Sequence, residues 1–244
     1  MRLFRNTFPA APRGRARTWS YGGGLRRVQA LIAAAGFVFG CIAFLFDTPA
    51  LAQDRPVRIV VLGDSLSAGL GLSGAEAFPA KLARALKAKG IAVDIANAGV
   101  SGDTASGGLA RLDWSVPEGT DAVIVQLGAN DALRGVDPKI TRGALDQIMR
   151  RMQARGIEVL LAGMLAPRNL GTDFTRRFDP IYPELAEKYG ALLYPFFLEG
   201  VATLARLNQR DGVHPNAEGV DIIVKGILPK VKELVTRVRA KSPA

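Results

Sequence analysis

The chain has 244 residues, which is enough for one domain with a full hydrophobic core or for two small ones. Its formal net charge of +10 is uneven: the first 52 residues hold seven arginines and one acid, Asp47, so +6 lies there and +4 on the rest. We therefore do not expect nucleic acid binding. The only cysteine, Cys41, and the only histidine, His214, are too few for a disulfide or a usual zinc site, and we expect no metal or other cofactor.

The first 52 residues have the parts of a secretion signal. An arginine-rich start is followed by an apolar run, Val28–Phe46, and then by small residues at Ala50 and Ala52 that suit signal peptidase. We expect cleavage before Gln53 and a periplasmic or secreted mature protein. The apolar run is also barely long enough to span a bilayer, so an uncleaved anchor is the alternative, and it would be the chain's one link to a membrane.

From residue 53 onward, apolar strands alternate with amphipathic helices, and no linker or repeat interrupts them. This alternation predicts one α/β domain over residues 53–244, with a three-layer α/β/α architecture and a mostly parallel, flavodoxin-like sheet of five strands. The predicted strands are Val57–Leu62, Ile91–Ala96, Asp121–Leu127, Ile157–Ala162 and Ala191–Tyr194. The predicted helices are Glu76–Lys89, Thr104–Leu112, Pro138–Arg155, the second half of Phe174–Tyr189, and Ala217–Arg237 with a kink at Pro229.

The chemistry of such a sheet lies at the carboxyl ends of its strands, and three of the predicted strands end in polar motifs. Ser65 follows the first strand in a loop, where its side chain should be exposed and nearby backbone N–H groups can bind an oxyanion. The alternative is that Ser65 caps a helix, as serine often does. Gly102, after the second strand, could present its backbone N–H without a side chain in the way, or could belong to a flexible turn. Asn130, after the third, could donate its amide into the same crevice or serve as a turn residue, and the neighbouring Asp131 reads as a structural cap.

Near the C-terminus, Asp211 precedes His214 by three residues in a loop before the last predicted helix. This spacing lets the carboxylate fold back onto one imidazole nitrogen while the other faces the crevice. A serine nucleophile needs such a base and such a partner for the base.

These motifs, in this order, resemble the block pattern of the SGNH or GDSL-type hydrolases. The resemblance extends from about Val57 to Val235 and is closest to the bacterial arylesterase, acyl-CoA thioesterase and lysophospholipase branch. The phrases similar to that branch are Asn97–Thr104 (NAGVSGDT), Leu127–Gly135 (LGANDALRG), Ile181–Leu185 (IYPEL) and Asp211–Asn216 (DGVHPN).

The resemblance implies a serine hydrolase of carboxylic esters and thioesters that works through an acyl-enzyme. By this resemblance Ser65 is the nucleophile, His214 the base and Asp211 its partner. The oxyanion hole would consist of the backbone N–H groups of Ser65 and Gly102 and the side chain of Asn130.

The expected partner is a small acyl ester or thioester, such as an aryl ester, an acyl-CoA or a lysophospholipid, and we expect no obligatory protein partner. Three loops, Gly69–Gly74, Leu133–Val136 and Met164–Leu170, are expected to form the walls of a shallow groove. Two alternatives use the same catalytic residues, namely an acyltransferase and a carbohydrate O-deacetylase. A third is a non-catalytic module with a phosphate cradled by Gly63–Ser67, which leaves the Asp–His pair without a role.

Overall fold

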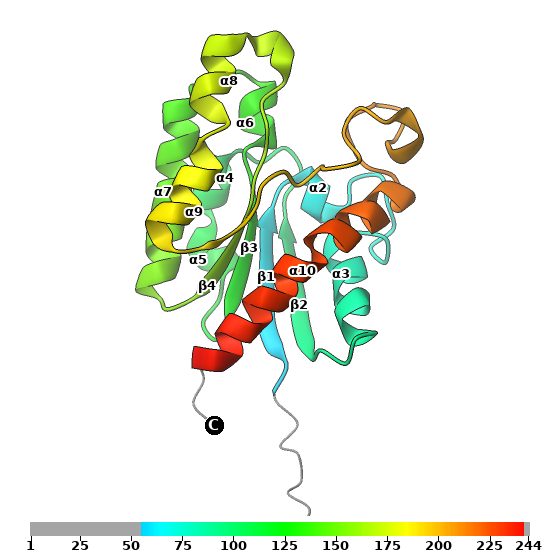
Figure 1. Ribbon diagram of the computed structural model, residues 1–244, viewed down its shortest axis with the longest axis vertical. Helices are drawn as coiled ribbons and strands as arrows, with labels where there is room; N and C mark the ends of the chain where they lie inside the picture. The colour runs from blue at the N-terminus through cyan, green and yellow to red at the C-terminus, as the bar shows by residue number, and fades with distance from the viewer. Residues whose placement is uncertain (1–54, 242–244) are drawn as a thin grey trace, which may run out of the picture. The chain divides into compact units, whose positions relative to one another are not determined.

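A sheet of five parallel strands runs through residues 55–241, the part of the chain that the computed structural model describes (Figure 1). The strand order is β2-β1-β3-β4-β5, and every neighbouring pair is parallel. The prediction of a five-stranded, mostly parallel sheet is confirmed. The strands are β1 (Val57–Gly63), β2 (Val93–Gly99), β3 (Ala122–Gln126), β4 (Glu158–Ala162) and β5 (Leu192–Tyr194).

Helices cover both faces of the sheet. Helices α3 and α10 pack against each other on one face, and α4, α7 and α9 form the layer on the other, so the architecture is α/β/α (Figure 1). The helices are α2 (Ser65–Ala68), α3 (Phe78–Lys87), α4 (Ala105–Ala110), α5 (Leu112–Ser115), α6 (Ala129–Leu133), α7 (Pro138–Ala154), α8 (Thr172–Phe178), α9 (Ile181–Tyr189) and α10 (Ala217–Lys241), with short 3₁₀ turns η1 (Arg168–Leu170) and η2 (Ala205–Leu207).

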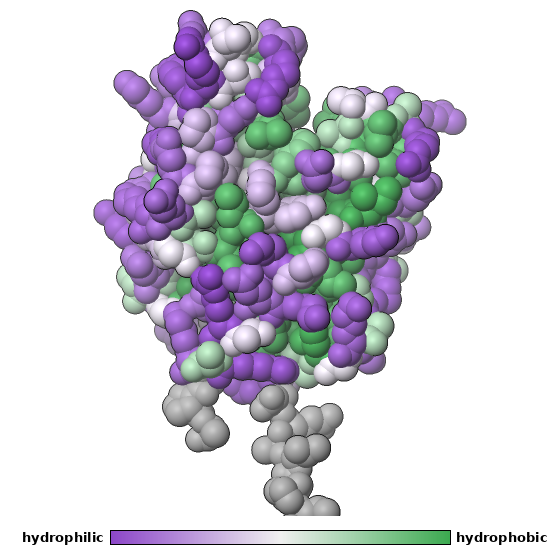
Figure 2. All heavy atoms as spheres, in the orientation of Figure 1, coloured by the Kyte–Doolittle hydropathy of each residue, from purple (hydrophilic) through white to green (hydrophobic). Residues whose placement is uncertain are grey.

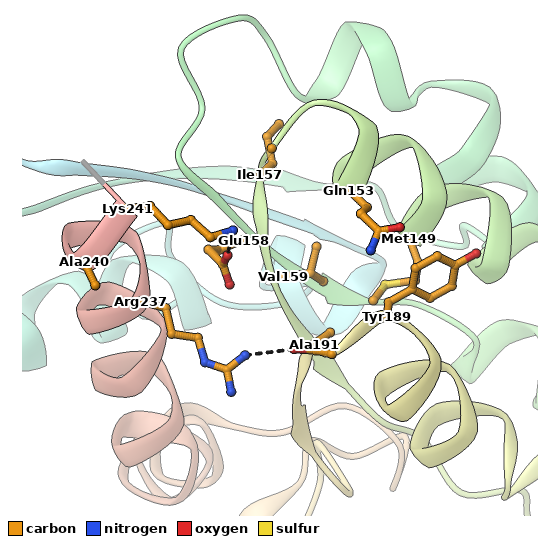
Figure 3. A pocket seen from close by; sticks show the side chains of 12 residues that line it. Met149, Gln153, Ile157, Glu158, Val159, Tyr189, Ala191, Arg237, Ala240 and Lys241 are labelled. Carbon is orange, nitrogen blue, oxygen red and sulfur yellow. Dashed lines mark hydrogen bonds and ion pairs between the residues drawn. The ribbon is translucent and has the colours of Figure 1, made fainter. Parts of the chain in front are cut away.

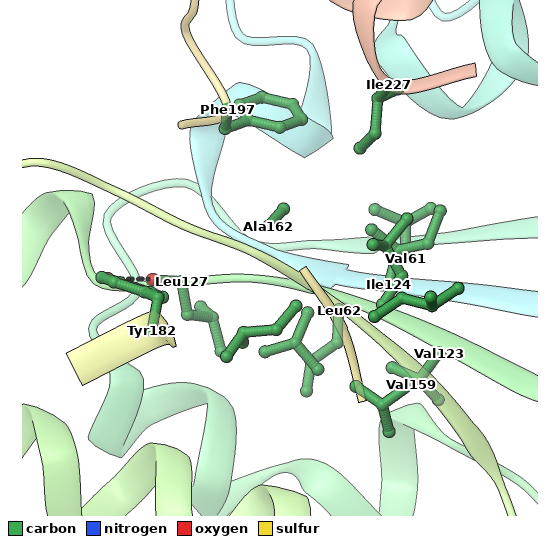
Figure 4. Packing of buried hydrophobic residues seen from close by; sticks show 14 of the residues in the cluster. Val61, Leu62, Val123, Ile124, Leu127, Val159, Ala162, Tyr182, Phe197 and Ile227 are labelled. Atoms are coloured by element: carbon green, nitrogen blue, oxygen red, sulfur yellow. Dashed lines mark hydrogen bonds between the residues drawn. The ribbon is translucent and has the colours of Figure 1, made fainter. Parts of the chain in front are cut away.

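The core lies on both sides of the three central strands, which are apolar on both faces. Figure 4 shows Phe197 and Ile227 packed above the sheet and Tyr182 below it. The buried Tyr182 hydroxyl donates to the backbone oxygen of Leu127 at 2.9 Å, so the phenol has a partner inside the core. This bond ties α9 to the end of β3, where one of the polar motifs begins.

The segment Phe174–Tyr189 is helical in both halves, which corrects the prediction that only its second half is helical. Helix α8 covers the first part, and α9 begins after Pro180. Phe174 and Phe178, one turn apart, stack with ring centroids 5.7 Å apart, and Phe178 is fully buried. This aromatic contact stabilises a helix whose other residues are mostly polar.

The last helix also differs from its prediction. It ends at Lys241, beyond the predicted end at Arg237, and Pro229 lies inside it. Pro229 removes one backbone hydrogen bond, but buried apolar residues on both sides of it hold the helix on the sheet.

Strands β1 and β2 end in glycines because α2 lies directly against them. A Cβ atom on Gly99 would lie 2.3 Å from the backbone nitrogen of Ala68, and one on Gly63 would lie 2.3 Å from Ser67 Oγ. Glycine at both positions lets the first turn of α2 pack on the strand ends. This packing places Ser65, the first residue of α2, at the carboxyl edge of the sheet.

Within residues 55–241, no helix is both long and apolar enough to cross a membrane. The predicted secretion signal and its cleavage position lie outside the described residues.

Candidate active site

Ser65 begins a short helix at the end of β1. The helix is capped by Asp64, whose Oδ1 accepts the backbone N–H of Leu66 at 3.0 Å, so Asp64 and not the serine is the cap. Ser65 is 8% exposed and lines a cavity. Its backbone N–H belongs to the first turn of a helix, where no carbonyl of the helix can accept it.

Ser65 contacts His214, the residue predicted to be its base. Ser65 Oγ lies 2.9 Å from His214 Nε2, and His214 Nδ1 lies 2.6 Å from Asp211 Oδ2. The other oxygen, Asp211 Oδ1, accepts the backbone N–H groups of Val213 at 2.9 Å and His214 at 3.0 Å. These two backbone bonds, with the side-chain bond to His214, lower the pKa of Asp211 to about 2.

The ionised Asp211 fixes which imidazole nitrogen carries the hydrogen. An ionised carboxylate only accepts hydrogen bonds, so Nδ1 of His214 must be the donor in this pair. In the neutral imidazole Nε2 is then an acceptor and takes the hydrogen bond from the Ser65 hydroxyl. The arrangement can therefore pass a proton from the serine to the histidine.

The loop that carries Asp211 and His214 is held in place by two side chains. Asn208 Nδ2 donates to the backbone oxygens of Val201 at 2.8 Å and Leu204 at 3.0 Å. Gln209 donates its backbone N–H to His214 O at 2.7 Å and its Nε2 to Leu70 O at 2.7 Å, just beyond α2. Gln209 thus links the histidine segment to the serine segment.

Asn130 and Gly102 lie at the ends of the two strands beside β1. Asn130 lies in α6 and lines the same cavity as Ser65 and His214, and its Nδ2 donates to the backbone oxygen of Asp103 at 2.9 Å. Gly102 has a left-handed φ of +86°, and its backbone oxygen accepts a bond from Arg134 at 2.9 Å. Gly102 does not line the cavity itself, but Asp103, the next residue, is bonded to Asn130.

The cavity in front of Ser65 has a volume of about 410 Å³ and mostly apolar walls. In Figure 2 it corresponds to the notch between the η1–α8 segment and the loop before α10, and hydrophobic atoms face this notch. Leu133 and the segment Met164–Arg168 form one wall, which confirms part of the predicted loops Leu133–Val136 and Met164–Leu170; residues 134–136 and 169–170 do not line the cavity. The opposite wall comes from the β5–α10 connection: Phe196, Leu198, Ala202, Thr203 and Val213.

The predicted wall loop Gly69–Gly74 does not line this cavity, and Phe196–Thr203 was not predicted. The glycine loop instead packs against Ala77 and Gln209. A Cβ atom on Gly71 would lie 2.1 Å from Gln209 Oε1, and one on Gly69 would lie 2.6 Å from the Cβ of Ala77. The loop therefore supports the histidine segment from outside.

Two buried aspartates stand close to the site. Burial raises the pKa of Asp64 to about 6, even though the N–H of Leu66 and the side chain of Gln126 lower it. Asp131 accepts the backbone N–H of Ala105, at the start of α4, and the hydroxyl of Thr141, each at 2.9 Å. Asp131 thus makes structural contacts: it accepts a first-turn N–H of α4, whose N-cap is Thr104, and joins α4 to α7.

A second hollow of about 430 Å³ lies far from Ser65, near the amino-terminal ends of β4 and β5 (Figure 3). Its charged groups bind one another or the backbone: Arg237 donates to Gly190 O at 2.9 Å, and Lys241 pairs with Glu158. No serine or histidine lines it. The chemistry therefore belongs to the cavity at the other edge of the sheet.

Between residues 55 and 241, no group of three or more His, Cys, Asp or Glu side chains could hold a metal ion.

The profile of the GDSL-like lipase/acylhydrolase family matches residues 61–222. The chain belongs to this family. The resemblance inferred from the motifs is thereby confirmed, and the chain is an ester-hydrolysing enzyme of the SGNH type.

Family members with curated names are similar over most of the chain. Esterase TesA of Pseudomonas aeruginosa is 36% identical over 80% of this chain and 96% of its own length. Thioesterase 1/protease 1/lysophospholipase L1 of Escherichia coli K12 is 38% identical over 72% of this chain and 84% of its own length. Among solved structures, the SGNH-family esterase AlinE4 is 48% identical with a TM-score of 0.63, and covers 73% of this chain and 96% of its own.

Proposed function

We propose that the chain hydrolyses carboxylic esters and acyl thioesters through an acyl-enzyme on Ser65, with His214 as the general base and Asp211 as its partner. The observation that carries this proposal is the unbroken chain of hydrogen bonds from Asp211 through His214 to Ser65. In it Asp211 fixes the hydrogen on Nδ1 of His214, which leaves Nε2 free to take the proton of the serine as Oγ attacks the acyl carbon.

The negative charge that develops on the substrate oxygen would be met by the backbone N–H groups of Ser65 and Gly102 and by the Asn130 amide. In the described part of the chain, neither of the two backbone N–H groups has a protein acceptor. Asn130 Nδ2 uses one of its hydrogens on Asp103 O, so the other is available. After attack, His214 returns its proton to the leaving group, and water then releases the acyl group by the same route.

The proposed substrates have a short to medium acyl chain and a variable leaving group. The apolar cavity beside Ser65, about 410 Å³ in volume, offers contact along an acyl chain. Among the described residues that line the cavity, Arg168 is the one with a permanent charge, and it pairs with Asp179 at 2.7 Å. The names of the relatives, esterase, thioesterase/lysophospholipase and arylesterase, cover the same range of acyl compounds.

We place this activity outside the cytoplasm. The proposal rests on the arginine-rich start, the apolar run Val28–Phe46 and the small residues before Gln53. Residues 53–244 would then form the mature hydrolase.

The test is labelling of the purified protein with an alkyl fluorophosphonate, followed by peptide mass spectrometry and assays on p-nitrophenyl esters. We expect a single adduct on Ser65 and complete loss of hydrolysis in the labelled protein. Ser65→Ala should fold normally and lose nearly all activity. Ser73→Ala, which alters an exposed serine outside the cavity, is the matched control and should keep full activity.

Retention of more than about one hundredth of the activity in Ser65→Ala would show that another group is the nucleophile, because a lost nucleophile costs far more than this in serine hydrolases. Product analysis with added glycerol separates hydrolysis from acyl transfer. Free acid as the main product supports a hydrolase, whereas acylglycerol would make the chain a transferase with the same residues.

A further inference from the structure

The guanidinium of Arg111 lies at the break between α4 and α5 and joins segments from two strand ends. Its Nε donates to Asp103 Oδ2 at 2.6 Å, and its Nη2 donates to the backbone oxygen of Gly63 at 2.9 Å. Its Nη1 donates to Ala98 O and to Ser115 Oγ, each at 2.8 Å. Four hydrogen bonds therefore use most of the five N–H donors that an arginine has.

The partners of Arg111 stand next to the groups assigned above to the oxyanion hole. Gly63 is the last residue of β1 and is separated from Ser65 by one residue. Asp103 directly follows Gly102, and its backbone oxygen accepts the amide hydrogen of Asn130 at 2.9 Å. One planar side chain thus connects, directly or through Asp103, the three segments that carry the oxyanion donors.

The pair has the properties of a rigid connection. The side chains of Arg111 and Asp103 are only 14% and 19% exposed, so water competes weakly for them. The planar guanidinium cannot rotate without breaking several hydrogen bonds at once. It is therefore held more firmly than the ammonium group of a lysine would be. Gly102, by contrast, has a positive φ and no side chain, so the position of its N–H depends on bonds made by other residues. These are the bond from Arg134 to Gly102 O and the bonds of Asp103, the next residue.

We propose that the Arg111–Asp103 ion pair is the positioning element of the oxyanion hole, which holds the Gly102 N–H and the Asn130 amide at fixed places relative to Ser65. Arg111 does not touch the substrate; it acts through Asp103 and Gly63. The inference rests on the proposed function, since the oxyanion donors matter only if Ser65 attacks an acyl group.

A positioning role and a merely structural role predict different kinetics. Misplaced oxyanion donors weaken binding of the transition state and leave binding of the ground state unchanged, so the loss should fall on kcat and not on KM. A loosened fold would instead lower the amount of active enzyme and the melting temperature, and would weaken all ligands together.

The variant that separates geometry from charge is Arg111→Lys, because lysine keeps the charge and loses the planar set of donors. We expect kcat for p-nitrophenyl butyrate to fall about 10- to 100-fold with KM nearly unchanged, because a displacement of about 1 Å in a catalytic group has effects of this size. An alkylboronic acid, which forms a tetrahedral adduct on Ser65, should bind at least about tenfold more weakly, whereas the product butyrate should bind as it does to the wild type.

Asp103→Asn is the second variant. It keeps the backbone oxygen that Asn130 uses and removes only the charge that orients Arg111, so it should show the same split between kcat and KM even if Arg111→Lys folds poorly. The matched control is Arg151→Lys, which alters an exposed pair with Asp113 at 3.4 Å on the same layer of helices. This control should leave kcat, KM and boronic acid affinity unchanged.

The proposal is overturned if well-folded Arg111→Lys and Asp103→Asn both keep kcat within about threefold of the wild type, since one lost oxyanion donor alone costs far more. It is also overturned if boronic acid and butyrate weaken equally, which would indicate a structural role. A wild-type protein that hydrolyses no ester would contradict the proposed function instead, and the two failures are therefore distinguishable.

Discussion

Ser65 Oγ and His214 Nε2 lie 2.9 Å apart, although 149 positions of the sequence separate the two residues. The serine follows the first strand, and the histidine follows the last one. The pair requires the loop before α10 to pack beside α2, where Gln209 of that loop donates to Leu70 O at 2.7 Å. Catalytic competence should therefore depend on this packing.

Replacement of Asn130 by alanine should lower turnover far more than substrate affinity. Its amide would meet a charge that exists only in the transition state, and loss of one such donor costs about 10²–10³-fold in kcat. Steady-state kinetics on p-nitrophenyl butyrate measure both constants. An increase in KM alone would make Asn130 a substrate-binding residue.

Asp211→Asn should reduce kcat by about 10³- to 10⁴-fold, because an amide no longer fixes the hydrogen on Nδ1 of His214. The pKa of Asp211, held at about 2 by the backbone N–H groups of His214 and Val213, also keeps this carboxylate ionised throughout the range in which the enzyme is assayed. The acid limb of the wild-type pH–rate profile should therefore arise from another group. An acid limb with a midpoint near pH 2 would contradict this assignment.

Asp64 should make the wild-type protein less stable as the pH rises. Burial raises its pKa from 3.8 to about 6, so the folded chain holds this proton more tightly than the unfolded chain. The free energy of unfolding then falls as the pH rises through this window, because the unfolded state loses the proton first. Asp64→Asn cannot titrate, so its melting temperature relative to the wild type should increase between pH 4 and pH 7.

Scanning fluorimetry at several pH values measures this difference, with Asp94→Asn, an exposed carboxylate on β2, as the control for the loss of a charge. A difference that is constant with pH, or that decreases, would show that Asp64 holds its proton no more tightly in the folded chain than in the unfolded one.

Specificity constants should rise from acetyl to hexanoyl or octanoyl esters. Each methylene buried in the apolar cavity contributes up to about 0.8 kcal/mol, or about fourfold. Ala202→Phe fills part of the wall and should remove the preference for long chains while acetyl esters are still cleaved. Ala240→Phe, in the second hollow, is the matched control. A steady fall from acetyl upward in the wild type would favour a deacetylase.

The mature protein should begin at Gln53. Intact-mass measurement on protein exported from its native host tests this, because cleavage after Ala52 removes the whole arginine-rich leader. A mass that still includes Val28–Phe46 would support the membrane anchor.

The sheet could be predicted from the sequence because its central strands are buried on both faces. Continuous apolar runs such as those of β1 and β3 have no other stable place in a domain of this size. Helix α8 could not be predicted, since Thr172–Phe178 is mostly polar and its helix depends on the stacked rings of Phe174 and Phe178 and on packing near α7. Local patterns do not contain such tertiary contacts.

Part of the candidate site could be predicted because its residues follow strands that the sequence reveals. Residues next to strand ends, such as Ser65 and Asn130, are located once the strands are known. The wall Phe196–Thr203 lies in an irregular connection with no periodic pattern, and nothing in the sequence indicates that it faces Ser65. The contacts of Arg111 could not be predicted either, because in the sequence a single arginine within a predicted helix looks like an ordinary solvent-exposed residue.

The connection between β5 and α10 carries both His214 with its aspartate and one whole wall of the cavity. Asn208 binds the two parts together through Val201 O and Leu204 O. A substitution that reshapes this wall therefore also strains the base. The facing wall, Met164–Arg168, holds no group of the proton relay. Directed evolution should therefore change the chain-length preference most easily through substitutions in Met164–Arg168. Substitutions on the histidine side should change the preference only with a loss of kcat.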